Sequence, residues 1–163
     1  MSEPTRDPVH GARYLFHPEG EDMVVETWLE PGGGLPAHMH PHQQERWSVV
    51  EGEVRFQLGK EKMILTPADG EVLVEPGTMH ALSAVAETDA HLRCQASPAL
   101  GLEDFLTDSA AAAREGLFMK GGIPKSLRGA RWAAKFLDAH RADVVMAFPP
   151  QFMQRAMIAV FGR

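Results

Sequence analysis

The chain of 163 residues has little cysteine and no long apolar run. Its single cysteine, Cys94, excludes a disulfide within the chain and is typical of a reducing compartment. No run of about eighteen apolar residues occurs, so we expect no transmembrane segment. The first residues, MSEPTRDPVHGAR, lack the apolar core of a secretory signal. These absences together predict a cytoplasmic protein.

Basic residues are scarce in the first hundred positions. Residues 1–100 hold 7 Lys and Arg against 16 Asp and Glu, a net charge of −9. Residues 101–163 hold 9 against 6, a net charge of +3. Nucleic acid binding requires clustered bases that release counterions from phosphates, and the acidic part lacks them. We therefore expect no nucleic acid partner, and we expect the basic tail to pack on its own acidic domain or on a second copy of the chain. The alternative for the tail is a contact with nucleic acid or an anionic membrane.

The pattern of apolar residues changes near residue 100. Before it, short runs rich in Val, Ile, Leu, Trp and Phe are separated by turn residues, as in DMVVETWLEPGGG, RWSVVEGE and EVLVEPG. This spacing predicts an antiparallel β-sandwich or barrel. After it, apolar residues recur every three or four positions in GLEDFLTDSAAAAREG, in SLRGARWAAKFLDAHRA and in PPQFMQRAMIAVFGR, which predicts helices. We expect a mainly β protein with a domain at residues 10–98 and a short α-helical extension at residues 99–163.

The helical extension needs a surface to pack on. Three short amphipathic helices cannot bury their apolar faces alone, so they should dock on the β domain or on a partner subunit. Three roles remain open for the extension: a lid over the mouth of the β domain, an arm of a dimer, or an interfacial contact with a membrane.

Three histidines and a glutamate lie within HMHPHQQE, residues 38–45. Side chains at i and i+2 of a strand share one face about 7 Å apart, so His38 and His40 can hold one ion between them. His42 would lie about 13 Å from His38 along a straight strand and joins only if the chain bends. Glu45 returns from the next predicted strand. Two imidazoles and a carboxylate suit Fe, Mn, Ni or Zn, although surface histidines would give the same local pattern without a metal.

The spacing of these residues matches a known motif. Gly32, His38, His40, Glu45 and Gly52 occupy every fixed position of G-x5-H-x-H-x3,4-E-x6-G, the first motif of the cupin superfamily. The chain therefore resembles a small single-domain, metal-binding cupin with a C-terminal helical extension.

A second stretch, DGEVLVEPGTMH, resembles the second cupin motif, G-x5-P-x-G-x2-H-x3-N. Gly77 and His80 are in register with it. The stretch departs from the motif at its first glycine, first proline and final asparagine, where this chain has Asp69, Glu75 and Ala84. These are turn or neighbouring positions, not ligands, so the departures concern the loop geometry and leave His80 as the predicted ligand.

The resemblance implies a double-stranded β-helix, or jelly-roll barrel, with four metal ligands pointing inward: His38, His40, Glu45 and His80. It implies one divalent transition metal, with Fe(II) slightly favoured over Mn, Ni, Zn and Cu, and it implies a homodimer. Three imidazoles and one carboxylate leave two neighbouring positions of a six-coordinate ion for other ligands. In some relatives such a glutamate leaves the metal and takes a proton, which makes Glu45 the predicted catalytic residue.

The expected function is that of a metal-dependent cupin enzyme acting on a small organic molecule. A dioxygenase of an enol, phenolic or oxo-acid substrate is the first hypothesis. A metal-dependent cyclase, isomerase or lyase is an alternative within the enzyme class. A non-catalytic cupin that binds a metal or a small molecule is the alternative outside it. The complete ligand set favours an enzyme, because a binding cupin can lose ligands without penalty.

Three residues are predicted to bind substrate: Trp47, His91 and Arg93. Trp47 shares strand parity with Glu45, so it should line the cavity, although an ordinary core position explains it equally well. His91 and Arg93 share one face of a predicted strand. If that face points inward, Arg93 binds a carboxylate or phenolate and His91 relays a proton; if it points outward, both are solvated. Three further histidines are interpreted as surface residues: His10, His17 and His140.

Overall fold

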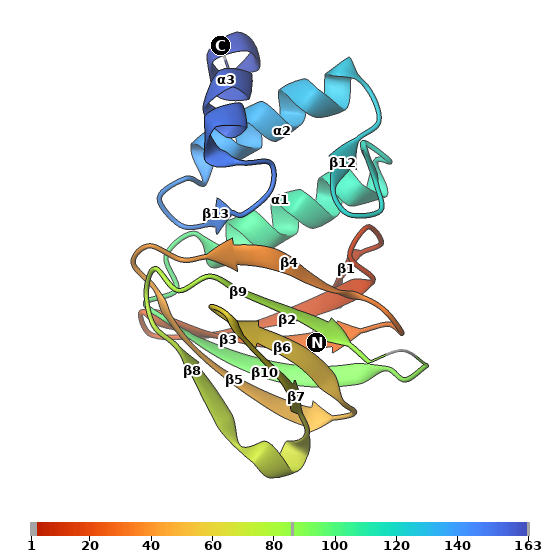
Figure 1. Cartoon of the computed structure of the whole chain (residues 1–163), viewed down its shortest axis with the longest axis vertical. Coiled ribbons are helices and arrows are strands. Elements are labelled where there is room, and N and C mark those ends of the chain that lie inside the picture. Colours follow the sequence, from red (N-terminus) through yellow and green to blue (C-terminus); the bar gives the residue numbers. More distant parts are fainter. Residues whose placement is uncertain (1–2, 86, 163) are drawn as a thin grey trace.

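Two large antiparallel β-sheets, a two-stranded hairpin and three α-helices form the part of the chain that the computed structural model describes, residues 3–85 and 87–162 (Figure 1). The six-stranded sheet has the order β1 (Thr5–Asp7), β2 (Ala12–Glu19), β3 (Asp22–Leu29), β10 (Ala90–Ser97), β5 (Gln44–Glu51) and β8 (Glu71–Val74). The five-stranded sheet has the order β13 (Val145–Met146), β4 (Gly34–Met39), β9 (His80–Ala84), β6 (Val54–Leu58) and β7 (Glu61–Leu65). A 3-10 turn, η1 (Pro67–Asp69), precedes β8.

The helices follow the last long strand and gather beyond β4 and β1 at one side of the sheets (Figure 1). They are α1 (Leu102–Arg114), α2 (Leu127–Ala139) and α3 (Gln151–Phe161), with the small β11 (Phe118–Met119) and β12 (Ile123–Pro124) hairpin between α1 and α2. α1 packs on β1, and α2 packs on α3. β13 pairs with β4, so the segment between α2 and α3 is hydrogen-bonded to the five-stranded sheet.

The apolar core lies between the two sheets. Strands β5 and β10 alternate buried and more exposed residues over most of their length, because successive side chains of a strand point to opposite faces. On β10 the buried set is Leu92, Cys94 and Ala96. The largest fully buried apolar side chains are Tyr14, Phe56, Leu29 and Leu92.

The predicted mainly β fold with a C-terminal helical region is confirmed. The two sheets are not joined into one closed barrel by backbone hydrogen bonds among the described residues, yet their arrangement is consistent with a jelly roll. Four short strands were not predicted: β1, β11, β12 and β13. Strands of two or three residues are too short to show an alternating pattern. Within the same residues, no helix combines the length and apolar character needed to cross a membrane.

The two glycines that bracket the HxH motif adopt backbone conformations that favour glycine. Gly32 has φ +71° before β4, and Gly52 has φ +85° in the turn between β5 and β6. A Cβ at Gly52 would lie 2.5 Å from the carbonyl oxygen of Asp89. Both turns therefore need glycine, and they fix where β4 begins and where β5 ends.

Candidate metal centre

Three strands from the two sheets bring four ligand-type side chains together. His38 lies on β4, where it pairs directly with His80 of β9, and His40 follows just after the end of β4. Glu45 comes from β5 of the six-stranded sheet. All four side chains are buried, and one ligand atom from each lies within 4.8 Å of the others. This spread is close to what one ion spans with bonds of about 2.0–2.2 Å.

The loop between His40 and Glu45 is held at both sides. The Gln43 side-chain Nε2 donates hydrogen bonds of 2.7 Å to the carbonyl oxygens of Pro98 and Ala99. The backbone N–H of Gly77 donates to the carbonyl of His40 at 2.8 Å, which ties the loop before β9 to the end of β4. The sharp return of the chain from β4 to β5 therefore places Glu45 beside the histidines.

Each histidine of the cluster has its Nδ1 bound to a backbone carbonyl. His38 Nδ1 lies 2.7 Å from the carbonyl oxygen of Pro36, and His80 Nδ1 lies 3.0 Å from that of Thr78. His40 Nδ1 lies 3.0 Å from the carbonyl oxygen of Asp143, which is in the helical extension. A carbonyl oxygen only accepts, so each Nδ1 carries the proton. Each Nε2 then has a free lone pair, which is the tautomer that metal ligation requires.

The Nε2 atoms of His40 and His80 lack a proper partner. They lie 3.1 and 2.9 Å from the two carboxylate oxygens of Glu45, but neither contact is aligned as a hydrogen bond. Both nitrogens are buried without a hydrogen-bond partner in the described part of the chain. Buried unpaired acceptors are unfavourable, and a cation between them and the carboxylate would satisfy all three groups. The residues therefore fit a divalent metal.

The charges of the cluster also suit a cation. Burial, together with the neighbouring His80 and His40, lowers the pKa of His38 to about 3. Burial alone would raise the pKa of Glu45, but its contacts with His40 and His80 hold it well below its usual range. At neutral pH, His38 is therefore neutral and Glu45 is ionised. Burial lowers the pKa of His40, but its contacts with Glu45 and Asp143 outweigh burial and raise that pKa above its usual value. The set therefore offers a neutral imidazole at His38 and an anionic oxygen at Glu45.

Trp47 lies beside this carboxylate. It is buried on β5, two residues after Glu45 and on the same face. Its indole Nε1 donates a hydrogen bond of 2.8 Å to Glu45 Oε2. Trp47 thus fixes one carboxylate oxygen, which is how groups next to metal ligands orient them.

A cavity of about 760 Å³ adjoins the cluster and extends to the helices. His38, His40 and Glu45 line one part of it, together with Trp47 and Cys94. Its other lining residues are mainly apolar and come from both sheets, the β11–β12 hairpin and the three helices. The volume lies within the roughly 300–1,000 Å³ of small-molecule sites. The helical extension therefore completes a cavity that the sheets alone would leave open.

The structure places two predicted substrate-binding residues outside this cavity. His91 and Arg93 lie on the face of β10 opposite to Leu92 and Cys94, which are buried. The inward-facing alternative for these two residues thus does not hold, because the apolar set of β10 fills the core. His91 instead stacks on Trp28, with ring centroids 4.6 Å apart, and its Nε2 contacts the Glu26 carboxylate.

His42 is also separate from the cluster, since its side chain is exposed.

Two histidines that we interpreted as surface residues have acidic partners. His10 lines the cavity, and its Nδ1 lies 2.7 Å from the carboxylate of the buried Asp7. His140 is buried, with its Nε2 3.3 Å from Asp108 Oδ2. The spacing of Asp7 and His10 in DPVH was a local signal for the first pair, whereas 32 residues separate the second. His17 is exposed, as expected.

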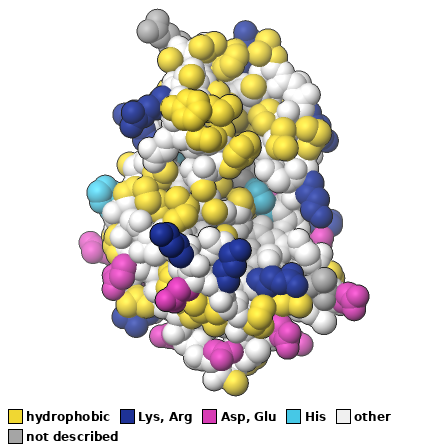
Figure 2. Space-filling view, in the orientation of Figure 1, with side chains coloured by type: hydrophobic (Ala, Val, Ile, Leu, Met, Phe, Trp, Pro, Cys, Tyr) yellow, Lys and Arg dark blue, Asp and Glu magenta, His cyan; other side chains and the backbone are white. Residues whose placement is uncertain are grey.

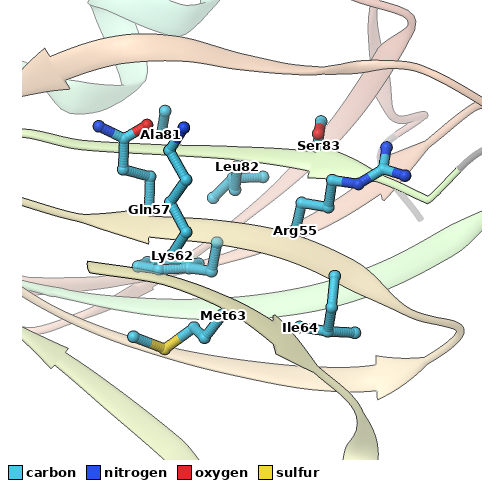
Figure 3. A pocket seen from close by; sticks show the side chains of 9 residues that line it. Arg55, Gln57, Lys62, Met63, Ile64, Ala81, Leu82 and Ser83 are labelled. Carbon is cyan, nitrogen blue, oxygen red and sulfur yellow. The ribbon is translucent and has the colours of Figure 1, made fainter. Parts of the chain in front are cut away.

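A second hollow, of about 440 Å³, lies on the five-stranded sheet and contains none of the four cluster residues. Figure 3 shows it between strands β6, β7 and β9. The labelled side chains are Arg55, Gln57, Lys62, Met63, Ile64, Ala81, Leu82 and Ser83. Its charged groups are both basic, so it offers none of the carboxylate or imidazole ligands that the first cavity has.

Comparison with known proteins agrees with this geometry. Residues 25–94 match the family model of the cupin domain. A protein named as an oxidoreductase from Arthrobotrys oligospora is 37% identical over 78 residues, 47% of this chain and 31% of that protein. A second, oxidoreductase OpS7 from Beauveria bassiana, is 36% identical over 47 residues, 29% of this chain and 15% of that protein. The matched segment thus spans a third or less of these curated relatives.

Solved structures show the same fold. An RmlC-like cupin from Shewanella frigidimarina superposes with a TM-score of 0.55 and 26% identity, over 63% of this chain and 87% of that one. KdgF from a Halomonas species superposes with a TM-score of 0.54 and 24% identity, over 60% of this chain and 86% of that one. The family match and the cluster at the positions of the cupin motifs assign residues 25–94 to the cupin superfamily.

Proposed function

We propose that this chain is a metal-dependent oxidoreductase that acts on a small organic molecule. The observation that carries the proposal is the buried cluster of His38, His40, Glu45 and His80, with the Nε2 atoms of His40 and His80 unpaired and a cavity beside it. Two relatives named as oxidoreductases support the reaction class. Because this chain matches a third or less of their length, their activity is a proposal for this chain.

The cluster would hold one divalent transition metal, through Nε2 of the three histidines and the carboxylate of Glu45. We favour Fe(II), although the donor set also accepts Mn, Ni, Zn and Cu. When bound, such an ion supplies a Lewis acid and, for iron, a redox centre. The first hypothesis for the reaction is the dioxygenation of an enol, phenol or oxo acid, since each of these offers an oxygen donor to the site.

The protein residues would then position the substrate and move a proton. Glu45 brings an ionised carboxylate to the site and is our proposed proton acceptor. Trp47 holds Oε2 of that carboxylate through its indole N–H, so it is a positioning residue. The apolar cavity walls exclude water around the substrate, which strengthens electrostatic interactions at the cluster.

We also propose a larger organisation for the chain. Residues 10–98 would be a jelly-roll barrel domain, and residues 99–163 would be an extension that covers the cavity. We further propose that the chain forms a homodimer and is located in the cytoplasm. The mass from light scattering tests the oligomeric state, and a monomeric mass would refute the dimer.

The metal content of two histidine variants tests the proposed function. Protein purified without chelators or a nickel column should carry about one metal ion per chain. His40→Ala should abolish this binding, because it removes one of four ligands. His42→Ala is the matched control, since His42 is exposed two residues away and should leave the metal content unchanged. An equal loss of metal in both variants would refute the assignment of His40 as a ligand.

Turnover provides the second part of the test. The iron-loaded protein should consume oxygen with at least one member of a panel of enols, catechols and 2-oxo acids. Glu45→Gln should bind metal more weakly and lose turnover where the reaction needs proton removal. If the wild type binds the metal but consumes no oxygen with any member, the dioxygenase hypothesis fails. Binding of panel members without turnover would favour the alternative function, a non-catalytic metal- and ligand-binding cupin.

A further inference from the structure

The cavity beside the metal cluster has mainly apolar walls. Aromatic side chains from the helical extension line it: Phe105, Phe118, Trp132 and Phe136. Several apolar lining residues are also exposed on the outer surface: Phe148 at 68%, Leu127 at 57%, Ile123 at 47% and Met153 at 44%. Figure 2 shows hydrophobic side chains gathered over the helical region. The cavity therefore reaches the surface through an apolar rim, which suits the entry of an apolar molecule.

One polar atom of the cavity wall outside the metal cluster has no hydrogen-bond partner among the described residues. The Thr27 side chain lines the cavity, and the residue is only 1% exposed. Its Oγ1 makes no hydrogen bond with any group among the described residues. A buried hydroxyl without a hydrogen-bond partner lowers the equilibrium constant for folding by about 5- to 150-fold, so such groups normally have a partner. The Thr27 hydroxyl thus indicates a missing hydrogen-bonding group inside the cavity.

The surroundings of Thr27 are suited to a neutral oxygen. Thr27 of β3 pairs across the sheet with Tyr14 of β2, and Tyr14 also lines the cavity. Burial, with the nearby Asp7, raises the pKa of Tyr14, so its hydroxyl keeps its proton. Asp7 itself is engaged by His10. This part of the wall therefore presents the hydroxyl groups of Thr27 and Tyr14, beside a carboxylate that is already paired with His10.

We propose that the cavity binds a largely apolar molecule with two oxygen functions, one at the metal cluster and a second, a hydroxyl or carbonyl, at Thr27 Oγ1. The apolar body of this molecule lies against the aromatic side chains of the helices. The inference deepens the proposed function and rests on it, because the first oxygen function binds through the metal. The class of ligand is a hydrophobic oxo acid or phenol that carries a second oxygen.

Matched pairs of probes test both parts of the inference. The probes are the 2-oxo acids with 8, 10 and 12 carbons and their ω-hydroxy derivatives, titrated by calorimetry into metal-loaded protein. Affinity in the unsubstituted series should rise about fourfold per methylene, as expected for burial of a CH2 group. At the chain length that reaches Thr27, the ω-hydroxy acid should bind at least as tightly as its unsubstituted partner.

The variant Thr27→Val removes the unpaired hydroxyl and keeps the shape of the side chain. It should leave metal binding unchanged and the melting temperature equal or higher, because a buried unpaired group is lost. It should weaken binding of the ω-hydroxy acid whose chain is long enough to reach Thr27 by at least fivefold. The affinity for the unsubstituted acid of the same length should change by less than twofold. Thr88→Val, in an exposed turn outside the cavity, is the matched control and should change neither affinity.

A second variant tests the apolar body independently. Ala133 of α2 lines the cavity, and Ala133→Phe should fill part of it and weaken the 12-carbon acid at least tenfold. Ala139→Phe makes the same change at an exposed position of the same helix outside the cavity and should have no effect.

The outcomes separate this inference from the proposed function. If Thr27→Val weakens both members of each pair equally, or neither, the second oxygen site is wrong, and a water molecule then explains the Thr27 hydroxyl. Affinities that do not change with chain length would refute the proposal that the ligand has an apolar body. If metal-free protein binds every probe as tightly as metal-loaded protein, the metal role in the proposed function fails, while the Thr27 and Ala133 results still report on the cavity.

Discussion

Replacing Trp47 with phenylalanine tests whether the indole N–H holds the metal-binding carboxylate in place. In the structure, Trp47 Nε1 donates to Glu45 Oε2 at 2.8 Å, and both side chains are buried. Phenylalanine keeps an aromatic ring in the core but has no donor. The carboxylate of Glu45 would lose the hydrogen bond from the Trp47 indole and would be freer to rotate away from the three imidazoles.

The magnitude follows from the kind of bond that is lost. A hydrogen bond to a charged acceptor contributes about 1.5–3 kcal/mol. At about 1.4 kcal/mol per factor of ten, this corresponds to a loss of roughly 10- to 150-fold in metal affinity. Loss of a residue that orients a metal ligand typically costs about 10- to 100-fold, which agrees with this range. We therefore expect Trp47→Phe to raise the dissociation constant for the metal about 10- to 100-fold.

The assay is a competition titration of metal-loaded protein against a chelator of known affinity. Trp28→Phe is the matched control, because Trp28 stacks on His91 at the outer face of the same sheet and does not line the cavity. The dissociation constant of that control for the metal should stay within threefold of the wild-type value. An affinity of Trp47→Phe within threefold of the wild type would refute the positioning role, and so would an equal loss in Trp28→Phe.

Three further predictions follow from the same contacts. Metal at about 100 times its dissociation constant should stabilise the fold by about 2.7 kcal/mol, which raises the melting temperature of a domain of this size by about 5–11 °C; calorimetry should show no such rise for His40→Ala. Cys94 is 1% exposed, so a thiol reagent such as DTNB should label it at the rate of unfolding, and fast labelling of the native protein would contradict its burial. Deleting residues 101–163 should expose the apolar cavity walls and cause aggregation in light scattering, whereas a soluble, monomeric 1–100 fragment that binds metal would contradict this.

Much of the site could be predicted from sequence because its residues lie close together along the chain. His38, His40 and Glu45 fall within eight positions, and the glycines around them match a family motif. His80 was assigned only through the second motif, since nothing local links it to the others. Pairing of β4 with β9 is what sets His80 opposite His38.

The orientation of β10 could be narrowed from sequence but not fixed. Alternation shows that His91 and Arg93 share one face and that Leu92 and Cys94 share the other. Which face points inward depends on the sheet packed against it. In the structure the apolar set is buried, because burial of apolar surface outweighs any gain from placing an arginine in the core.

The sequence by itself determined the division into strands and helices and the group of candidate ligands, because periodicity and motif spacing are local properties of the chain. Only the tertiary structure decided how those ligands are held and what they face. The proton on His40 Nδ1 is directed to the carbonyl of Asp143, 103 residues away, and the free hydroxyl of Thr27 faces a cavity that the distant helices complete. Such contacts arise from packing between segments far apart in sequence, and no local pattern of residues encodes them.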